Sequence, residues 1–195
     1  MIGALLVVAV ATLLGYGVAR ADSRRNFLSE IALLVTFAVP STVVGVGIIN
    51  LWNRPGIPGG LYRSLAIIVV AYLARFTPVA TLILAASVRQ VPTSLEEAAE
   101  LSGAGWLRRF TRIILPQLRS GVTAALLVTF IFAFGELGAT VLVTPPGSST
   151  LPVHIYTMIA NAPPREVAAL ALMQMGIILI PLALFGIPGS WRRSR

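Results

Sequence analysis

Cysteine and lysine are both absent from the 195-residue sequence, and histidine occurs only once. Without cysteine the chain has no disulfide, no thiolate metal site and no cysteine nucleophile. Without lysine it has no phosphate-binding loop of the Walker A type, because the lysine of that loop contacts the phosphates of ATP. The single histidine, His154, has no second histidine or cysteine with which to complete a metal site. We therefore expect no catalytic residue, metal or cofactor, and any ATP hydrolysis must belong to another chain.

Charged residues are also scarce, at 11% of the chain, whereas 56% of the residues are hydrophobic. This composition is too apolar for an ordinary soluble domain and predicts a membrane protein. The net charge of +8 is compatible with nucleic-acid binding. However, the arginines occur in short clusters beside apolar stretches, as the topology rule for membrane proteins predicts. We therefore expect lipid, and not nucleic acid, around this chain.

Five apolar stretches are each about long enough to cross a bilayer as a helix, which takes roughly 17–25 residues. They cover residues 2–19, 31–52, 65–88, 122–143 and 167–187. Pro40 is expected to kink the second stretch. Thr150, followed by Leu151 and Pro152, predicts a short helix as far as Ile159 between the last two. The sequence thus predicts an all-α fold, a polytopic membrane bundle of about five transmembrane helices in one domain covering residues 1–195.

The distribution of arginine predicts the orientation of this bundle. Three arginines lie in residues 20–25, five in residues 89–119 and three at the C-terminus. Only Arg54, Arg63 and Arg165 fall in the segments that would lie on the other side. Because arginine-rich loops stay in the cytoplasm, we expect a multi-pass protein of the cell inner (plasma) membrane with its N-terminus outside and its C-terminus inside. The loop of residues 89–121 would then be cytoplasmic.

This cytoplasmic loop contains the one long polar interval, residues 92–118. Ser94 and Glu97 have the spacing of a capping box and predict a helix that begins near Leu95 and stops at Gly103. A second helix would follow, with an apolar stripe of Trp106, Phe110, Ile113 and Ile114 and with Arg108, Arg109 and Arg112 facing elsewhere. Pro116 should break or kink that helix.

The loop resembles the EAA loop of the integral-membrane permease subunits of binding-protein-dependent ABC importers. The matching residues are Glu97, Ala98, Ala99, Gly103, Ile113, Leu115 and Pro116, each at the spacing of that pattern. The resemblance implies the MetI-like permease fold and a short helix that docks on a separate cytoplasmic ABC ATPase. It also implies a second permease subunit, identical or different, and an extracytoplasmic solute-binding protein. An amphipathic loop lying on the membrane surface is the alternative.

Two charged residues fall inside predicted spans: Arg75 in the third and Glu136 in the fourth. A charge at mid-bilayer costs about 2.5–3.5 kcal/mol on insertion scales and normally faces the bundle interior. One hypothesis is an ion pair between Arg75 and Glu136 that locks these two spans together. The other is that one or both line the translocation path or its gate.

The run from Glu136 to Ala139, before an external loop, resembles the ferric-iron branch of these permeases. Thiamine, polyamine and oxyanion importers share the same layout, so ferric iron is one of several solutes to consider. Iron-type relatives are often double-length fusions and many relatives have a sixth span, so the chain could be half of a longer permease. A competing class is a proton-coupled secondary transporter, independent of an ATPase, that uses Glu136 as a proton relay.

Overall fold

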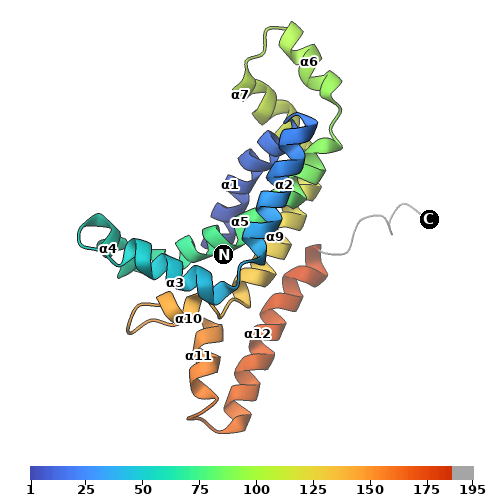
Figure 1. Ribbon diagram of the computed structural model, residues 1–195. Helices are drawn as coiled ribbons and strands as arrows, with labels where there is room; N and C mark the ends of the chain where they lie inside the picture. Colours follow the sequence, from blue (N-terminus) through green and yellow to red (C-terminus); the bar gives the residue numbers. More distant parts are fainter. Residues whose placement is uncertain (186–195) are drawn as a thin grey trace, which may run out of the picture.

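The computed structural model describes residues 1–185, and every regular element in that range is helical, which confirms the all-α prediction (Figure 1). In chain order the elements are α1 (Ile2–Ala19), α2 (Ser23–Ala38), α3 (Ser41–Trp52), α4 (Ile57–Tyr62), α5 (Ala66–Arg89), α6 (Thr93–Leu101), α7 (Trp106–Arg109), the π-helical segment η1 (Phe110–Ile114), α8 (Leu115–Gln117), α9 (Arg119–Phe134), α10 (Thr140–Val143), α11 (Leu151–Met158) and α12 (Pro164–Phe185). The last two residues of the fifth predicted span and the three C-terminal arginines lie outside the described residues.

The centre of the molecule is a bundle of α1, α5 and α9. Its core is formed by the buried side chains Val7, Val8, Ala11, Phe76, Ala80, Leu84, Ala125 and Ala133. Alanine at so many of these positions lets the helices approach closely, which is how helices associate in lipid, where there is no hydrophobic driving force between them. Large apolar side chains such as Leu13 and Leu14 point outward from α1.

Three helices, α1, α5 and α12, are long and apolar enough to cross a membrane. Two bent helix pairs bring the number to as many as five among the described residues, if each pair counts as one span. The first pair is α2 with α3, and the second joins residues 106–117 to α9. A bundle of about five spans therefore remains the prediction, with two of its members bent.

The second predicted span is not one helix. Helix α2 begins at Ser23 and ends at Ala38, and α3 then leaves at 91° to it. Pro40 explains the bend, because proline disfavours the helical conformation at the residue before it. Val39 is accordingly extended, with φ −60° and ψ 129°. The expected kink is therefore a full corner in the chain.

The fourth predicted span is interrupted as well. Helix α9 begins at Arg119 and ends at Phe134, and the short helix α10 starts only at Thr140. The segment between the second and third predicted spans, residues 53–64, contains a short helix, α4. The predicted helix after Thr150 is confirmed as α11.

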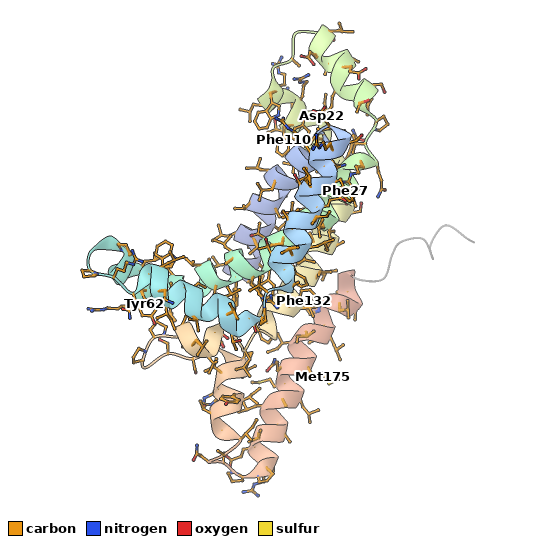
Figure 2. All side chains as sticks on the ribbon, viewed as in Figure 1. Asp22, Phe27, Tyr62, Phe110, Phe132 and Met175 are labelled. Atoms are coloured by element: carbon orange, nitrogen blue, oxygen red, sulfur yellow. The ribbon has the colours of Figure 1, made fainter. Side chains whose placement is uncertain are left out.

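The two ends of the bundle differ in composition. Figure 1 shows α6 and α7 together at one end, beside the end of α1 and the start of α2, whereas α11 and the start of α12 lie at the opposite end. Figure 2 labels both Asp22 and Phe110 at the α6 end. The arginines of residues 20–25 and 89–119 are thus gathered at one end, as a single cytoplasmic face would require.

Candidate functional site

Helix α6 is the first element of the candidate site, and it begins differently from the prediction. It starts at Thr93 with Pro92 at the N-cap position, and no side chain caps it. The predicted capping box of Ser94 and Glu97 is therefore wrong, because Ser94 is already the second residue of the helix. The predicted stop is confirmed, since Gly103 has a φ of +77°, a conformation that residues with a side chain rarely adopt.

One side of α6 is open to solvent. We call Leu95, Glu97, Ala98 and Leu101 the docking face, because all four side chains are exposed and Leu101 is 90% exposed. Trp106 and Leu107, just beyond the glycine turn, are exposed too. Exposed apolar side chains gathered in this way are typical of surfaces that contact a partner protein or a membrane, so this face is a candidate contact surface. Of the other motif residues, Gly103, Leu115 and Pro116 are exposed, and Ala99 and Ile113 are half-buried.

The opposite side of α6 carries Glu96, which sequence reasoning did not single out. Glu96 is 8% exposed and is the one buried residue of the helix. Its Oε1 accepts a hydrogen bond of 2.8 Å from Arg20 Nε and lies 2.6 Å from Arg20 Nη2. Its Oε2 accepts a hydrogen bond of 2.6 Å from the Tyr16 hydroxyl. The motif includes Glu97, whereas the buried carboxylate of this helix is that of Glu96.

A cluster of buried apolar side chains joins the second half of the loop, residues 106–118, to the end of the bundle. Phe110, Ile114 and Leu118 are buried against Val88, in the last turn of α5, and Val91, in the segment just after it. This confirms Phe110 and Ile114 as the inner stripe of the second loop helix. Trp106 and Ile113 are less buried than predicted, because the wide π-helical turn of η1 changes which side chains share a face.

Two further features of the loop were predicted from the sequence: the direction of Arg109 and a break at Pro116. Arg109 pairs with Glu100 of α6 and therefore does not face away from the rest of the loop. The chain bends by 73° between residues 106–117 and α9, two residues after Pro116, which confirms the break expected there.

Arg75 does not pair with Glu136, so the predicted ion pair is wrong. Arg75 Nη1 donates to the carbonyl oxygens of Phe37, at 2.7 Å, and of Val39, at 2.5 Å. Its guanidinium carbon lies 5.2 Å from the centre of the Phe37 ring. The corner at Pro40 leaves the last carbonyls of α2 without their usual helical donors. Arg75 therefore satisfies backbone groups that the bend exposes.

Glu136 has the corresponding role at the break between α9 and α10. Its Oε1 accepts a hydrogen bond of 2.7 Å from the backbone N–H of Ala139, three residues ahead, in the manner of a helix N-cap. Glu136 is only 9% exposed. The break lies against α3, because a Cβ at Gly138 would overlap the Ser41 hydroxyl. Arg75 and Glu136 therefore each stabilise a break between two helices and do not pair with each other.

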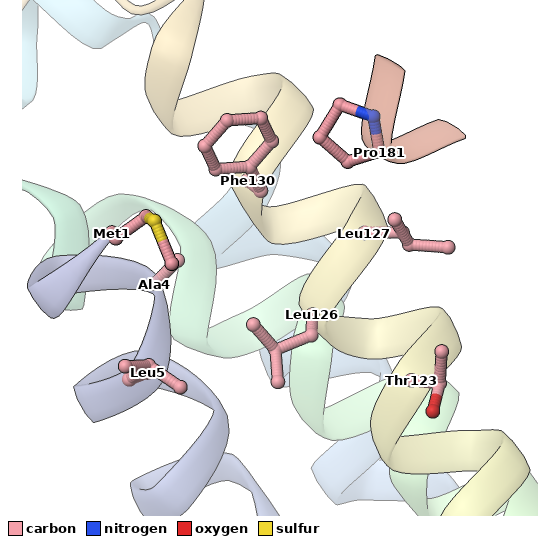
Figure 3. Close-up of a pocket in the computed structure, with 8 residues that line it drawn as sticks. All are labelled: Met1, Ala4, Leu5, Thr123, Leu126, Leu127, Phe130 and Pro181. Carbon is pink, nitrogen blue, oxygen red and sulfur yellow. The ribbon is translucent and has the colours of Figure 1, made fainter. Parts of the chain in front are cut away.

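One cavity among the described residues does not resemble a solute site. It has a volume of about 370 Å³ and lies between α1 and α9, with Pro181 of α12 across from them (Figure 3). Its walls are Met1, Ala4, Leu5, Thr123, Leu126, Leu127, Phe130 and Pro181. The Thr123 hydroxyl is the single polar side-chain group among them. Such a lining suits lipid tails better than a polar solute.

A family model described as the binding-protein-dependent transport system inner membrane component matches residues 11–187 of this chain. Individual relatives are also permease proteins of transport systems. A candidate 2-aminoethylphosphonate transport system permease protein of Salmonella paratyphi A, PhnV, is 29% identical over 143 residues, which are 73% of this chain and 53% of the relative.

Two further relatives carry other names. The Fe(3+)-transport system permease protein FbpB 2 of Haemophilus influenzae is 27% identical over 183 residues, 94% of this chain and 36% of the relative. The trehalose transport system permease protein SugB of Mycobacterium tuberculosis is 27% identical over 191 residues, 95% of this chain and 66% of the relative. The chain spans about half the length of the Salmonella relative. All three names describe transport proteins and none describes an enzyme.

Proposed function

Because this chain belongs to the inner membrane components of binding-protein-dependent transport systems, we propose that it is an ABC importer permease subunit that forms a solute path and couples it to a separate ATPase. The docking face carries this proposal. Glu97, Ala98 and Leu101 lie exposed on a helix that the fold holds away from the bundle. Small Ala98 lets a partner approach closely, and Leu101 offers an apolar side chain for a groove, the usual way in which a short helix docks on a partner.

The partners follow from this role. A cytoplasmic ABC ATPase would receive the docking face, since the chain has no lysine for a Walker A loop. A second permease subunit, identical or different, would complete the path, and an extracytoplasmic solute-binding protein would deliver the solute. ATP would close the ATPase dimer and draw two docking helices together, which biases the bundle toward the outward-facing state.

The solute itself is left open in this proposal. The names of the relatives mention 2-aminoethylphosphonate, Fe(3+) and trehalose, so ferric iron is one option among several. Arg75 and Glu136 are proposed to lie beside the path or its gate. In support, Glu136 Oε2 has no hydrogen-bond partner among residues 1–185, although Oε1 caps the turn at Ala139. A carboxylate oxygen that no other group of the described chain contacts is a candidate contact for a solute.

Co-purification tests the docking face. We expect Glu97→Lys and Gly103→Leu each to reduce recovery of the ATPase with the tagged chain at least about tenfold, because loss of a central interface residue often costs 2 kcal/mol or more. Glu97→Lys reverses the charge on the face, and Gly103→Leu strains the turn that orients it. The readout is the ratio of ATPase to permease after affinity purification from membranes.

Matched controls lie at the opposite end of the bundle. Glu166→Lys makes the same charge change on an exposed residue of α12. Gly147→Leu replaces a glycine with a φ of +81° in an exposed loop. Both controls should retain the wild-type ratio. Equal ATPase recovery in all four variants would remove the docking assignment.

Single-cysteine labelling tests the orientation, and the absence of native cysteine gives it no background. Ser148→Cys in the loop before α11 should react with a membrane-impermeant maleimide in intact spheroplasts. Ser102→Cys, at the end of α6, should react only after the membrane is opened. Both serines are exposed. The reverse pattern would overturn the predicted orientation but not the family assignment.

A further inference from the structure

We propose that Tyr16, Arg20 and Glu96 form a clamp that joins α6 rigidly to the end of α1, so that any displacement of the docking face moves α1 with it. The inference rests on the proposed function, since it is an ATPase that would displace α6. It assigns positioning roles to three residues outside the matched motif. The clamp also separates two adjacent carboxylates by role: Glu97 faces the partner, and Glu96 faces the bundle.

The geometry of the clamp satisfies both oxygens of Glu96. Arg20 approaches Oε1 through two nitrogens, Nε at 2.8 Å and Nη2 at 2.6 Å, and the Tyr16 hydroxyl donates to Oε2 at 2.6 Å. The side chains of Arg20 and Glu96 are only 19% and 10% exposed. Both arginine nitrogens converge on Oε1 and the Tyr16 hydroxyl holds Oε2, so the two oxygens are fixed from different groups and the carboxylate is held in direction as well as in distance.

The same arginine also holds the connection between α5 and α6. Arg20 Nη2 donates to the carbonyl oxygen of Val91, at 2.9 Å, in the short segment that links these helices. One guanidinium therefore ties three places together: the last turn of α1, the linker after α5, and the buried side of α6. Tyr16 adds a fourth contact, because its ring packs edge-on against Phe110 of η1 at 5.4 Å between centroids.

The remaining attachments of α6 are weaker. The ion pair of Glu100 with Arg109 joins α6 only to the next segment of the same loop, and the Glu100 side chain is 66% exposed. Solvent screening makes such exposed pairs worth little. Beyond Leu101 the chain passes through the glycine turn at Gly103, which adds no side chain. The clamp is therefore the contact through which α6 can push or pull on the bundle.

A displacement of α1 would be transmitted to α5, because the two helices pack against each other in the core. Val7 and Ala11 of α1 pack against Ala80 and Leu84 of α5 in the main cluster of buried side chains. Close-packed interiors transmit strain because they have few voids into which side chains can yield. An inward movement of α6 would thus shift α1 and α5 together, toward the end of the bundle that carries the external loops.

Spin-label distances on the full chain in nanodiscs provide the test. The reporter pair is Leu13→Cys with Ser102→Cys, both at exposed positions, in a chain with no other cysteine. We expect a narrow distance distribution in the otherwise wild-type chain. Glu96→Gln should widen the distribution at least twofold. Glu97→Gln, the same substitution one residue later at an exposed position of α6, should leave the width unchanged.

A second arm uses the complex with the ATPase, with ATP and vanadate as the ligands. The wild-type distance should stay the same, because α1 and α6 move as one body. In Glu96→Gln the ATPase should still co-purify within about twofold of wild type, and the distance should change on ATP addition, because α6 then moves alone. Equal widths and equal ATP responses in Glu96→Gln and wild type would overturn the clamp.

Two further variants keep the result decisive. If Glu96→Gln does not accumulate in membranes, Tyr16→Phe removes only one of the two hydrogen bonds to Glu96 and should give an intermediate width; a wild-type width would then count against the clamp. The exchange Arg20→Glu with Glu96→Arg should restore part of the narrow distribution. Failure of the wild-type chain to bind any ATPase would sink the proposed function, whereas the first arm would still decide whether α6 is fixed to α1.

Discussion

Replacing Arg75 by glutamine is expected to lower the midpoint of thermal unfolding by roughly 5–15 °C, the largest effect on stability foreseen for a single substitution in this chain. Arg75 Nη1 donates to two backbone carbonyls, those of Phe37 and Val39. Hydrogen bonds to a charged group are worth about 1.5–3 kcal/mol each. Water is scarce inside a membrane, so carbonyls left without a donor there find no replacement.

The control for Arg75→Gln is Arg54→Gln. Arg54 also donates to a backbone carbonyl, that of Asn50, but the contact is exposed and stays within four residues. Surface substitutions of this kind usually change stability by no more than about 0.5 kcal/mol. Unfolding of detergent-solubilised protein, followed by circular dichroism, measures both variants. If Arg75→Gln unfolds at the wild-type temperature, the corner at Pro40 does not depend on Arg75.

Arg75→Lys refines the same result. A lysine ammonium is a single point of donation on a flexible stem and lacks the planar fork of arginine. We expect the lysine to reach one of the two carbonyls, so that Arg75→Lys lowers the unfolding midpoint by about half as much as Arg75→Gln does. Loss of stability with normal transport in Arg75→Gln would confine Arg75 to a structural role and remove it from the proposed path.

Hydropathy predicted much of this fold, because the length and apolar character of a span follow from the physics of the bilayer. The first predicted span, residues 2–19, has the bounds of helix α1, and the third, residues 65–88, differs from α5 by one residue at each end. Each is a continuous apolar run that needs no partner to be recognised. Gly103 and Pro116 were equally readable, since a positive φ and a missing N–H act locally.

The polar contacts were not predictable in the same way. Glu96 and Glu97 are neighbours in the sequence, and only the rotation of α6 relative to α1 decides which of them meets Arg20, 76 residues away. Arg75 and Glu136 looked like partners because both are charges in apolar spans. The breaks at Pro40 and after Phe134 leave unsatisfied backbone groups near Arg75 and Glu136. Each charged side chain therefore hydrogen-bonds to those backbone groups and not to the other charged residue. Apolar patterns reveal spans, but not the rotation of one helix about another.

Glu136→Gln should separate capping from transport. The amide oxygen of glutamine can still accept from the Ala139 N–H, so we expect the unfolding midpoint to fall by only about 3 °C, in keeping with the loss of roughly 1 kcal/mol on exchanging a charged acceptor for a neutral one. Glu136→Leu leaves the buried Ala139 N–H without an acceptor. Its midpoint should fall by roughly 5–12 °C.

Uptake is then compared between wild type and Glu136→Gln, because this variant keeps the cap while it removes the charge. The solute is the one that the wild-type transporter imports, measured in vesicles that contain the complete complex. If the carboxylate lies on the path, uptake should fall at least about tenfold, which corresponds to 1.4 kcal/mol of lost stabilisation. Wild-type uptake in Glu136→Gln would mean that the charge serves only the turn between α9 and α10. Uptake that survives removal of the ATPase but collapses with the proton gradient would instead favour a proton relay at Glu136.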